Sequence, residues 1–243
     1  MYYRKFVSLV MAIIFVLVSL GLASAKSIST ATDQHRLDSI EPLDLAVLIQ
    51  DDLVSQVSNE LGVTRDFIRS LPTGSRVMVG YITAGSLQVR QPFTSDLDKA
   101  ARSLRMPLSS ASSAPYNPYV EVREALKKFQ DNGGNEKAVL LVSDGLDTSR
   151  GFDSTAAGHT LDLERVIKEA QRRNVSVFSF YAPSVGLTSH NHLAASYGQS
   201  SLNRLANETG GKAFFQGITG FVTFDSYFRQ LRETLNRQYA KAA

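Results

Sequence analysis

Two adjacent aspartates, Asp51 and Asp52, stand close behind the apolar run LDLAVLI, and a helix-like pattern begins after them. Ser55 lies four residues beyond Asp51, and Asp144 follows a second apolar run, KAVLLVS. Carboxylate and hydroxyl oxygens suit hard cations such as Mg²⁺, which usually keep several waters when bound. These residue types therefore predict either a divalent-cation site or polar residues that cap helices and hold loops.

A hydrolase is an alternative for the same acidic residues. His190 and His192 share the loop sequence SHNH and could act with the aspartates and Ser55. The sequence has no Gly-x-Ser-x-Gly motif, which would place a nucleophile on a strained turn. It also has no glycine-rich loop of the kind that holds phosphates.

A phosphoacceptor of the receiver type would also use an acidic pair after its first strand. The interval of about 90 residues between Asp52 and Asp144 is about twice what such a compact fold uses, and no lysine follows the run VSVFSFY. These two features argue against a receiver.

Residues 1–25 have the pattern of a secretory signal peptide. Arg4 and Lys5 precede an apolar run of about 17 residues, and the sequence ASA stands before Lys26 as a small-x-small cleavage signal. We expect cleavage before Lys26, which gives a secreted or periplasmic protein with no membrane insertion after cleavage. An uncleaved anchor is the alternative, although a membrane span needs roughly 20 apolar residues.

Composition excludes several classes of site and partner. The 243 residues include no cysteine, so disulfides, thiol catalysis and thiolate metal sites are absent, and a bacterial envelope is the compartment we expect. The formal charge of +3 includes Arg4 and Lys5, and 3 − 2 leaves about +1 after cleavage. So small a charge gives no reason to expect nucleic-acid binding.

The rest of the chain divides into a Ser/Thr-rich flexible tether, residues 26–41, and one domain, residues 42–240. In the domain, apolar runs typical of buried strands alternate with helical patterns. We expect strands at 43–49, 75–83, 87–91, 137–143, 175–181 and 212–215. We expect helices at 53–71, with a second start capped by Thr64, and at 94–105, 119–129, 160–173, 197–208 and 223–239.

This alternation predicts a three-layer α/β fold. Right-handed crossovers give a Rossmann-like, doubly wound, mainly parallel sheet with helices on both faces, and the hairpin adds one antiparallel edge strand. Ligands of such sheets bind at the carboxyl ends of strands, where the strand order reverses. Asp51, Asp52 and Asp144 all follow predicted central strands, so we expect them to meet there.

The order of elements, together with several stretches, resembles the von Willebrand factor A-type (VWA) domain, in an exported bacterial subgroup. The stretches include SAPYNPYVEVREALKKF, VLLVSDGLDT and LNRLANETGGKAFF, and the resemblance covers nearly all of residues 43–239. It implies the α/β fold described above. It also implies a metal-ion-dependent adhesion site built from Asp-x-Ser-x-Ser, a threonine before a middle helix, and an aspartate after the fourth strand.

Three of these five positions match: Asp51, Ser55 and Asp144. Leu53 stands in place of the first serine, and its side chain has no oxygen. The loop before the middle helix offers no threonine; Tyr116 or Asn117 lies nearest. The resemblance therefore implies a degenerate metal site that binds Mg²⁺ or another divalent cation weakly or not at all, and we expect no other cofactor.

The function implied is that of an exported, non-enzymatic protein-binding module, used for adhesion or as a scaffold and largely independent of metal. Its protein partner is unknown. The alternatives are an envelope hydrolase and a metal-dependent binding protein that uses Asp51, Ser55 and Asp144. The residues expected to contact a partner lie around the predicted carboxyl rim of the sheet: Asp52, Tyr116, Asn117 and Tyr119.

Overall fold

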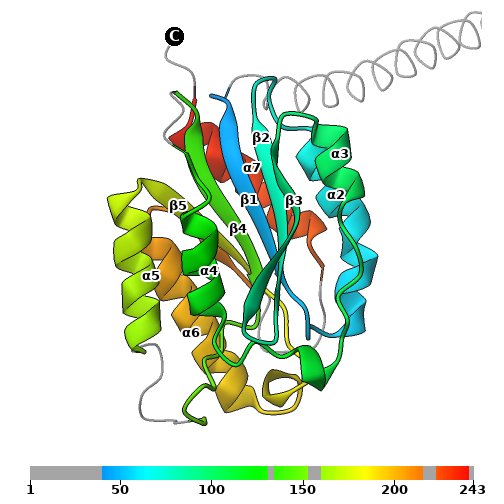
Figure 1. Ribbon diagram of the computed structural model, residues 1–243, viewed down its shortest axis with the longest axis vertical. Coiled ribbons are helices and arrows are strands. Elements are labelled where there is room, and N and C mark those ends of the chain that lie inside the picture. The colour runs from blue at the N-terminus through cyan, green and yellow to red at the C-terminus, as the bar shows by residue number, and fades with distance from the viewer. Residues whose placement is uncertain (1–39, 131–133, 153–159, 216–222, 241–243) are drawn as a thin grey trace, which may run out of the picture.

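A six-stranded sheet with helices on both faces dominates the computed structural model (Figure 1). The structure describes residues 40–130, 134–152, 160–215 and 223–240. The expected signal peptide, all but the last two residues of the expected tether, and His35 and His159 lie outside this part. Among the described residues, no helix combines the length and the apolar character needed to cross a membrane.

The elements follow one another as strands and crossover helices. The strands are β1 (Leu43–Gln50), β2 (Arg76–Thr83), β3 (Ser86–Thr94), β4 (Glu136–Ser143), β5 (Val175–Tyr181) and β6 (Ala213–Phe214). The α-helices are α2 (Leu61–Arg69), α3 (Leu97–Arg102), α4 (Pro118–Leu126), α5 (Leu161–Arg172), α6 (His192–Glu208) and α7 (Asp225–Gln238). Short 3₁₀ helices are η1 (Ser55–Glu60), η2 (Ala111–Ser113) and η3 (Leu187–Ser189).

The strand order is β3-β2-β1-β4-β5-β6. All neighbours are parallel except β2 and β3, which form the antiparallel hairpin at one edge. The chain builds outward from β1 to one side and from β4 to the other, so the order reverses between these two strands. The predicted fold class is confirmed, and the carboxyl ends of β1 and β4 lie side by side because Ile49 pairs with Val142.

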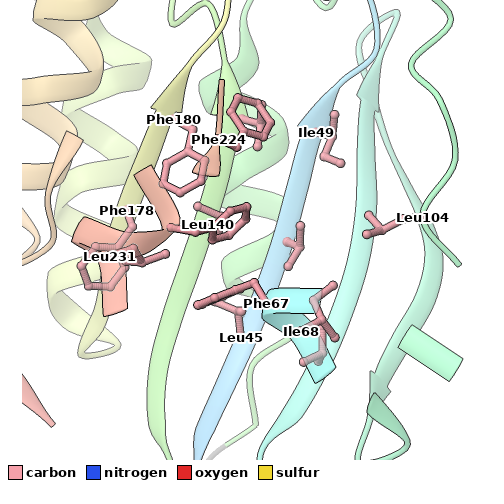
Figure 2. Close-up of a cluster of buried hydrophobic side chains, with 14 of the residues drawn as sticks. Leu45, Ile49, Phe67, Ile68, Leu104, Leu140, Phe178, Phe180, Phe224 and Leu231 are labelled. Atoms are coloured by element: carbon pink, nitrogen blue, oxygen red, sulfur yellow. The ribbon is translucent and has the colours of Figure 1, made fainter. Parts of the chain in front are cut away.

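One face of the sheet packs on α2, α3 and α7. Figure 2 shows part of this core, in which side chains of β1 and of later strands meet those of α2 and α7. Phe228 of α7 stacks on Phe67 at 4.6 Å between ring centroids and meets Phe180 of β5 at 4.9 Å. Burying a side chain of this size stabilises the fold by roughly 1.5–3 kcal/mol.

The other face packs on α4, α5 and α6. Side chains along β1 alternate between the two faces of the sheet: Ala46 and Leu48 pack in this second core, and Leu45 and Ile49 pack in the first. Since successive side chains of a strand point to opposite faces, Gln50 lies on the same face as Leu48. That placement determines what Gln50 contacts at the end of the strand.

Two expected helix boundaries were wrong. Thr64 caps no helix, because α2 already begins at Leu61 and the Thr64 hydroxyl donates to the Glu60 carbonyl at 2.9 Å. Helix α6 begins at His192, five residues before the expected start, because the Asn191 side chain accepts from the amides of the first turn. At α6 local capping, which apolar spacing does not reveal, sets the helix start, whereas the α2 start at Leu61 has no side-chain cap.

Candidate functional site

Asp51, the first expected metal ligand, is fully buried in an ion pair with Arg105. Both of its carboxylate oxygens accept from the guanidinium at 2.7 Å, and one also accepts from the Leu108 amide at 3.0 Å. The Arg105 guanidinium lies over the Tyr81 ring, 3.9 Å from its centroid. The Tyr81 hydroxyl donates to the Arg105 carbonyl and accepts from its amide, which fixes the loop that carries the arginine. The charge of Asp51 is thus already balanced by a side chain.

Asp52 and Asp144 form a second, separate cluster centred on the Gln50 amide. Gln50 Nε2 donates to Asp52 Oδ1 at 2.8 Å and to Asp144 Oδ1 at 3.1 Å. Gln50 Oε1 accepts from the Ser143 hydroxyl at 2.5 Å and from the Asp144 amide at 3.3 Å. These four partners fix the orientation of the amide, because donors face its oxygen and acceptors face its nitrogen.

Further donors hold Asp144 from the other side. The Leu146 amide donates to its Oδ1 and the Thr188 hydroxyl to its Oδ2, each at 3.1 Å. Thr188 also receives support from Ser184, whose amide donates to its hydroxyl at 2.8 Å. Asp144 is therefore buried at the carboxyl end of the sheet, where the loop that follows β5 contacts it.

The two carboxyl groups of this cluster are perturbed by burial. Burial and the neighbouring Asp144 raise the pKa of Asp52 from 3.8 to about 6, against the lowering effect of the Gln50 hydrogen bond. Burial also raises the pKa of Asp144, although hydrogen bonds from Leu146, Ser184, Gln50 and Thr188 oppose the rise. A neutral amide satisfies hydrogen-bonding needs but does not cancel charge, so both carboxylates resist ionisation.

Ser55 and Leu53, the other two positions of the expected motif, are not placed as ligands. Ser55 is exposed at the start of η1. Leu53 is fully buried in the core beside α2 and α7, and it forms an isolated bridge with Ser184. The chain thus buries the Leu53 side chain in the core at the position where the motif alignment places a ligand.

The expected set of Asp51, Ser55 and Asp144 does not converge on one point. Asp51 faces Arg105, Asp144 faces Gln50 and Thr188, and Ser55 is at the surface. Within the described residues, no group of three or more histidine, cysteine, aspartate or glutamate side chains is arranged to hold a metal. The residues present therefore do not fit the divalent cation that the resemblance implies.

Of the four expected partner contacts, Tyr116 alone is at the surface, with 62% of its area exposed. Asn117 is buried as the N-cap of α4: its side chain accepts from the Tyr119 amide and donates to Asp162. Tyr119 is buried too, and its hydroxyl donates to the Gly145 carbonyl at 2.5 Å. Asp52 lies in the buried cluster. These three residues support the rim from below and are corrected from contact residues to supporting ones.

The turn after Asp144 packs directly on α6. Gly145 has a left-handed φ of +69°, and a β-carbon on it would lie 2.5 Å from the Gly198 carbonyl oxygen. A β-carbon on Gly198 would lie 1.9 Å from the Asp144 carbonyl oxygen. Since no real β-carbon approaches so closely, both positions need glycine, and α6 holds the Asp144 turn in place.

The loop histidines are arranged apart from these clusters. His190 Nδ1 shares a hydrogen bond with the Ser189 hydroxyl at 3.1 Å, and both His190 and His192 are exposed. Neither histidine has a hydrogen bond to Ser55, Asp51 or Asp144 among the described contacts. The geometry that would favour a hydrolase is thus not seen in this part of the chain.

Gln50 and Arg105 were not singled out from the sequence. Arg105 lies 54 residues after its partner, in a loop with no periodic pattern, and nothing in the spacing links the two. Gln50 did carry a signal: it is a polar residue at the end of an apolar strand, on the same face as Ala46 and Leu48. Strand alternation combined with the β1–β4 pairing would have placed it beside Ser143.

Comparisons with known proteins bear on the fold. No protein-family model matches the chain, and no curated protein matches it. Among solved structures, it is similar to an aerotolerance-related membrane protein from Bacteroides fragilis, at 14% identity and a TM-score of 0.51 over 81% of this chain and 100% of that one. BatB from Bacteroides thetaiotaomicron follows at 14% identity and 0.49, over 80% and 98%. The N-terminal domain of TFIIH p34 follows at 11% and 0.48, over 82% and 98%. The chain thus has a VWA-like α/β fold, shared at low identity with the aerotolerance-related protein.

Proposed function

We propose that this chain is an exported, non-enzymatic binding module whose carboxyl rim engages a protein partner without a divalent cation. The observation that carries the proposal is the distribution of exposed apolar side chains. Of the seven large ones exposed in the described part of the chain, five lie on loops or helix starts near the carboxyl ends of β1, β4 and β5, and Phe215 follows the short edge strand β6. These five rim residues are Met106, Leu108, Tyr116, Leu161 and Leu193.

The direction of the chain explains why the five rim residues lie at the same end of the sheet. In a parallel α/β sheet, each crossover helix begins at the carboxyl ends of the strands, which is the lower end of the molecule in Figure 1. Leu161 and Leu193 open α5 and α6, and Met106 and Leu108 lie on the connection between α3 and α4. Methionine and tyrosine are enriched at protein interfaces because they combine apolar area with adaptable or polar ends.

The rim rests on a rigid support. The Leu108 amide donates to Asp51, and the Tyr116 carbonyl accepts from the Thr148 amide at 2.6 Å. The loops that display the apolar residues are thereby tied to the carboxyl ends of β1 and β4. A surface held in this way loses little conformational entropy when it binds, which favours affinity.

The test is capture of envelope proteins from the source organism by the purified chain, with and without EDTA. We expect the same partner in both conditions and its loss when Met106, Leu108 and Tyr116 are all changed to serine. A matched control changes Val89, which is exposed but lies within the edge strand β3 and not on a loop or helix start. Partner binding that disappears in EDTA would contradict the metal-independent module, and binding unaffected by the rim substitutions would contradict the rim.

Export is a separate part of the proposal and has its own measurement. N-terminal sequencing of the protein recovered from the envelope fraction should begin at Lys26. A protein that starts at Met1 and stays with the membrane would indicate an uncleaved anchor instead.

A further inference from the structure

We infer that the Gln50 amide takes the place that a divalent cation would occupy between Asp52 and Asp144, and that a change at position 50 is sufficient to let the chain bind one. The inference concerns the buried cluster of Gln50, Asp52 and Asp144 and the hydroxyl of Thr188. It goes beyond partner binding, since metal affinity and stability can be measured with no partner present.

The first argument is position. Gln50 is the last residue of β1 and is 2% exposed, at the point where the strand order reverses between β1 and β4. It lies between two carboxylates that come from different loops, one after each of these strands. A cation that bridged the two loops would have to stand between the same two carboxylates.

The second argument is chemical. The two hydrogens of Nε2 point at Asp52 and Asp144, at 2.8 and 3.1 Å, so the positive end of the amide dipole faces both acids. A bound cation needs oxygen atoms directed at it. Here the nearest group directs hydrogens into that space, and its own oxygen is occupied by Ser143 and the Asp144 amide.

On the other side of β1, the Arg105 guanidinium takes the place of a cation beside Asp51. Asp51 faces a guanidinium that donates to both of its oxygens, so this acid is no longer available as a ligand. The chain thus supplies two groups of its own, one charged and one polar, to hold the three aspartates of the rim. This arrangement predicts the same rim conformation in the presence and absence of divalent cations.

The experiment replaces Gln50 with aspartate. Gln50→Asp removes the inward hydrogens and adds a third carboxylate to Asp52, Asp144 and the Thr188 hydroxyl, which gives an oxygen-rich set. We expect calorimetry to show Mg²⁺ binding by this variant with a dissociation constant of about 1 mM or tighter, and none by the wild type. At tenfold excess over that constant, Mg²⁺ should raise the Tm of the variant by about 3–5 °C.

Two controls isolate the role of position 50. Gln50→Asn has nearly the same shape as Gln50→Asp but keeps an amide, so it should bind no Mg²⁺. Leu53→Ser adds a hydroxyl where the motif alignment places a missing ligand, and it should lower stability without creating Mg²⁺ binding. Mg²⁺ binding by Leu53→Ser, or by the wild type at 1 mM or tighter, would overturn the inference.

A variant that folds poorly still gives a result. If Gln50→Asp folds only when Mg²⁺ is added, the inference is supported, since the metal then replaces the lost amide. A folded Gln50→Asp with no Mg²⁺ response would overturn it. If that variant folds under neither condition, the wild-type Gln50 side-chain amide is followed by NMR during a Mg²⁺ titration to 20 mM. The absence of a saturable shift supports the inference, and a saturable shift overturns it.

Discussion

The two ends of β1 carry the same kind of ion pair in different surroundings. At the amino end, Asp44 accepts from Arg76 at 3.0 and 2.5 Å, and the Asn135 amide adds a third hydrogen bond at 3.0 Å. Asp44 and Arg76 are also direct partners in the β1–β2 register. One acid meets one base there, and the charge is balanced.

At the carboxyl end, three aspartates share one arginine. Arg105 balances Asp51, while Asp52 and Asp144 have only the neutral Gln50 amide between them. The difference teaches that a buried arginine–aspartate pair is by itself a structural device, since the amino end uses one to join β1 and β2. What distinguishes the rim is that Asp52 and Asp144 form no ion pair within the described part of the chain, and that is where a cation would otherwise be needed.

The largest expected effect comes from removing the base at the carboxyl end. Arg105→Met should lower the free energy of unfolding by about 3–5 kcal/mol, because it leaves the fully buried Asp51 carboxylate without a counter-charge. The measurement is urea denaturation at pH 7. The double variant Asp51→Asn/Arg105→Met should recover at least half of the loss. A single-variant loss below about 1 kcal/mol would show that Asp51 does not depend on Arg105.

The next largest effect concerns Asp52, one of the two acids that share the Gln50 amide, and the dependence of protein stability on pH. The pKa of Asp52 is about 6 in the folded protein against an ordinary 3.8, so the folded state holds this proton where the unfolded chain has released it. Its contribution to stability is therefore greatest below about pH 3.8 and is lost as the pH rises through 6. Asp52→Asn should raise stability at pH 8 by up to about 3 kcal/mol and change it little at pH 4.

Denaturation curves of both proteins at pH 4, 6 and 8 provide the check. The asparagine keeps an oxygen for the Gln50 amide, so the hydrogen bond survives the change. The stability of Asp52→Asn should still depend on pH, because burial also raises the pKa of Asp144 and of Glu121. An equal effect of Asp52→Asn at all three pH values would show that Asp52 ionises normally.

Removing Arg76, the base at the amino end of β1, should lower the free energy of unfolding by less. Arg76→Met leaves Asp44 with the Asn135 hydrogen bond and with a second base, Lys137, as its partner in the β1–β4 register, so we expect a loss of about 1–2 kcal/mol in the same urea experiment. A loss as large as that of Arg105→Met would remove the contrast between the two ends.

The smallest stability effect should come from the rim surface itself. Met106→Ser and Leu108→Ser alter side chains that are 67% and 61% exposed, so each should change stability by less than about 0.5 kcal/mol. Thermal melts measure this, and partner capture measures the binding that both should weaken. Normal capture by both variants would place the binding surface elsewhere.

Sequence reasoning reached the fold because the apolar runs are long and distinct. The runs KAVLLVS and VSVFSFY both became central strands with bounds within one residue of those expected. It also placed Asp52 and Asp144 near each other, since both follow strands that had to be central. The alternation of side chains along a strand and the order of strands and helices are both readable from short stretches of sequence, and they were sufficient for these two predictions.

The details of the site depend on side-chain direction and long-range contacts, which local patterns do not carry. Asp51 and Asp52 are adjacent in sequence, yet they face different clusters because neighbouring residues at a strand end point to opposite sides. The motif alignment assigned ligand roles by spacing alone, and it therefore chose Asp51 and Ser55 and treated Leu53 as a missing ligand. Choosing correctly required knowing that Arg105 reaches back to Asp51 from a loop without periodic pattern.

The Arg105 pair also bears on how such a chain would mature. A protein that crosses a membrane unfolded and folds on the far side normally has to acquire its metal there, from whatever concentration the surroundings offer. Here the counter-charge for Asp51 is part of the polypeptide and arrives in a fixed one-to-one ratio. Folding and completion of this part of the rim would then be a single event, independent of the supply of divalent ions and unaffected by chelators.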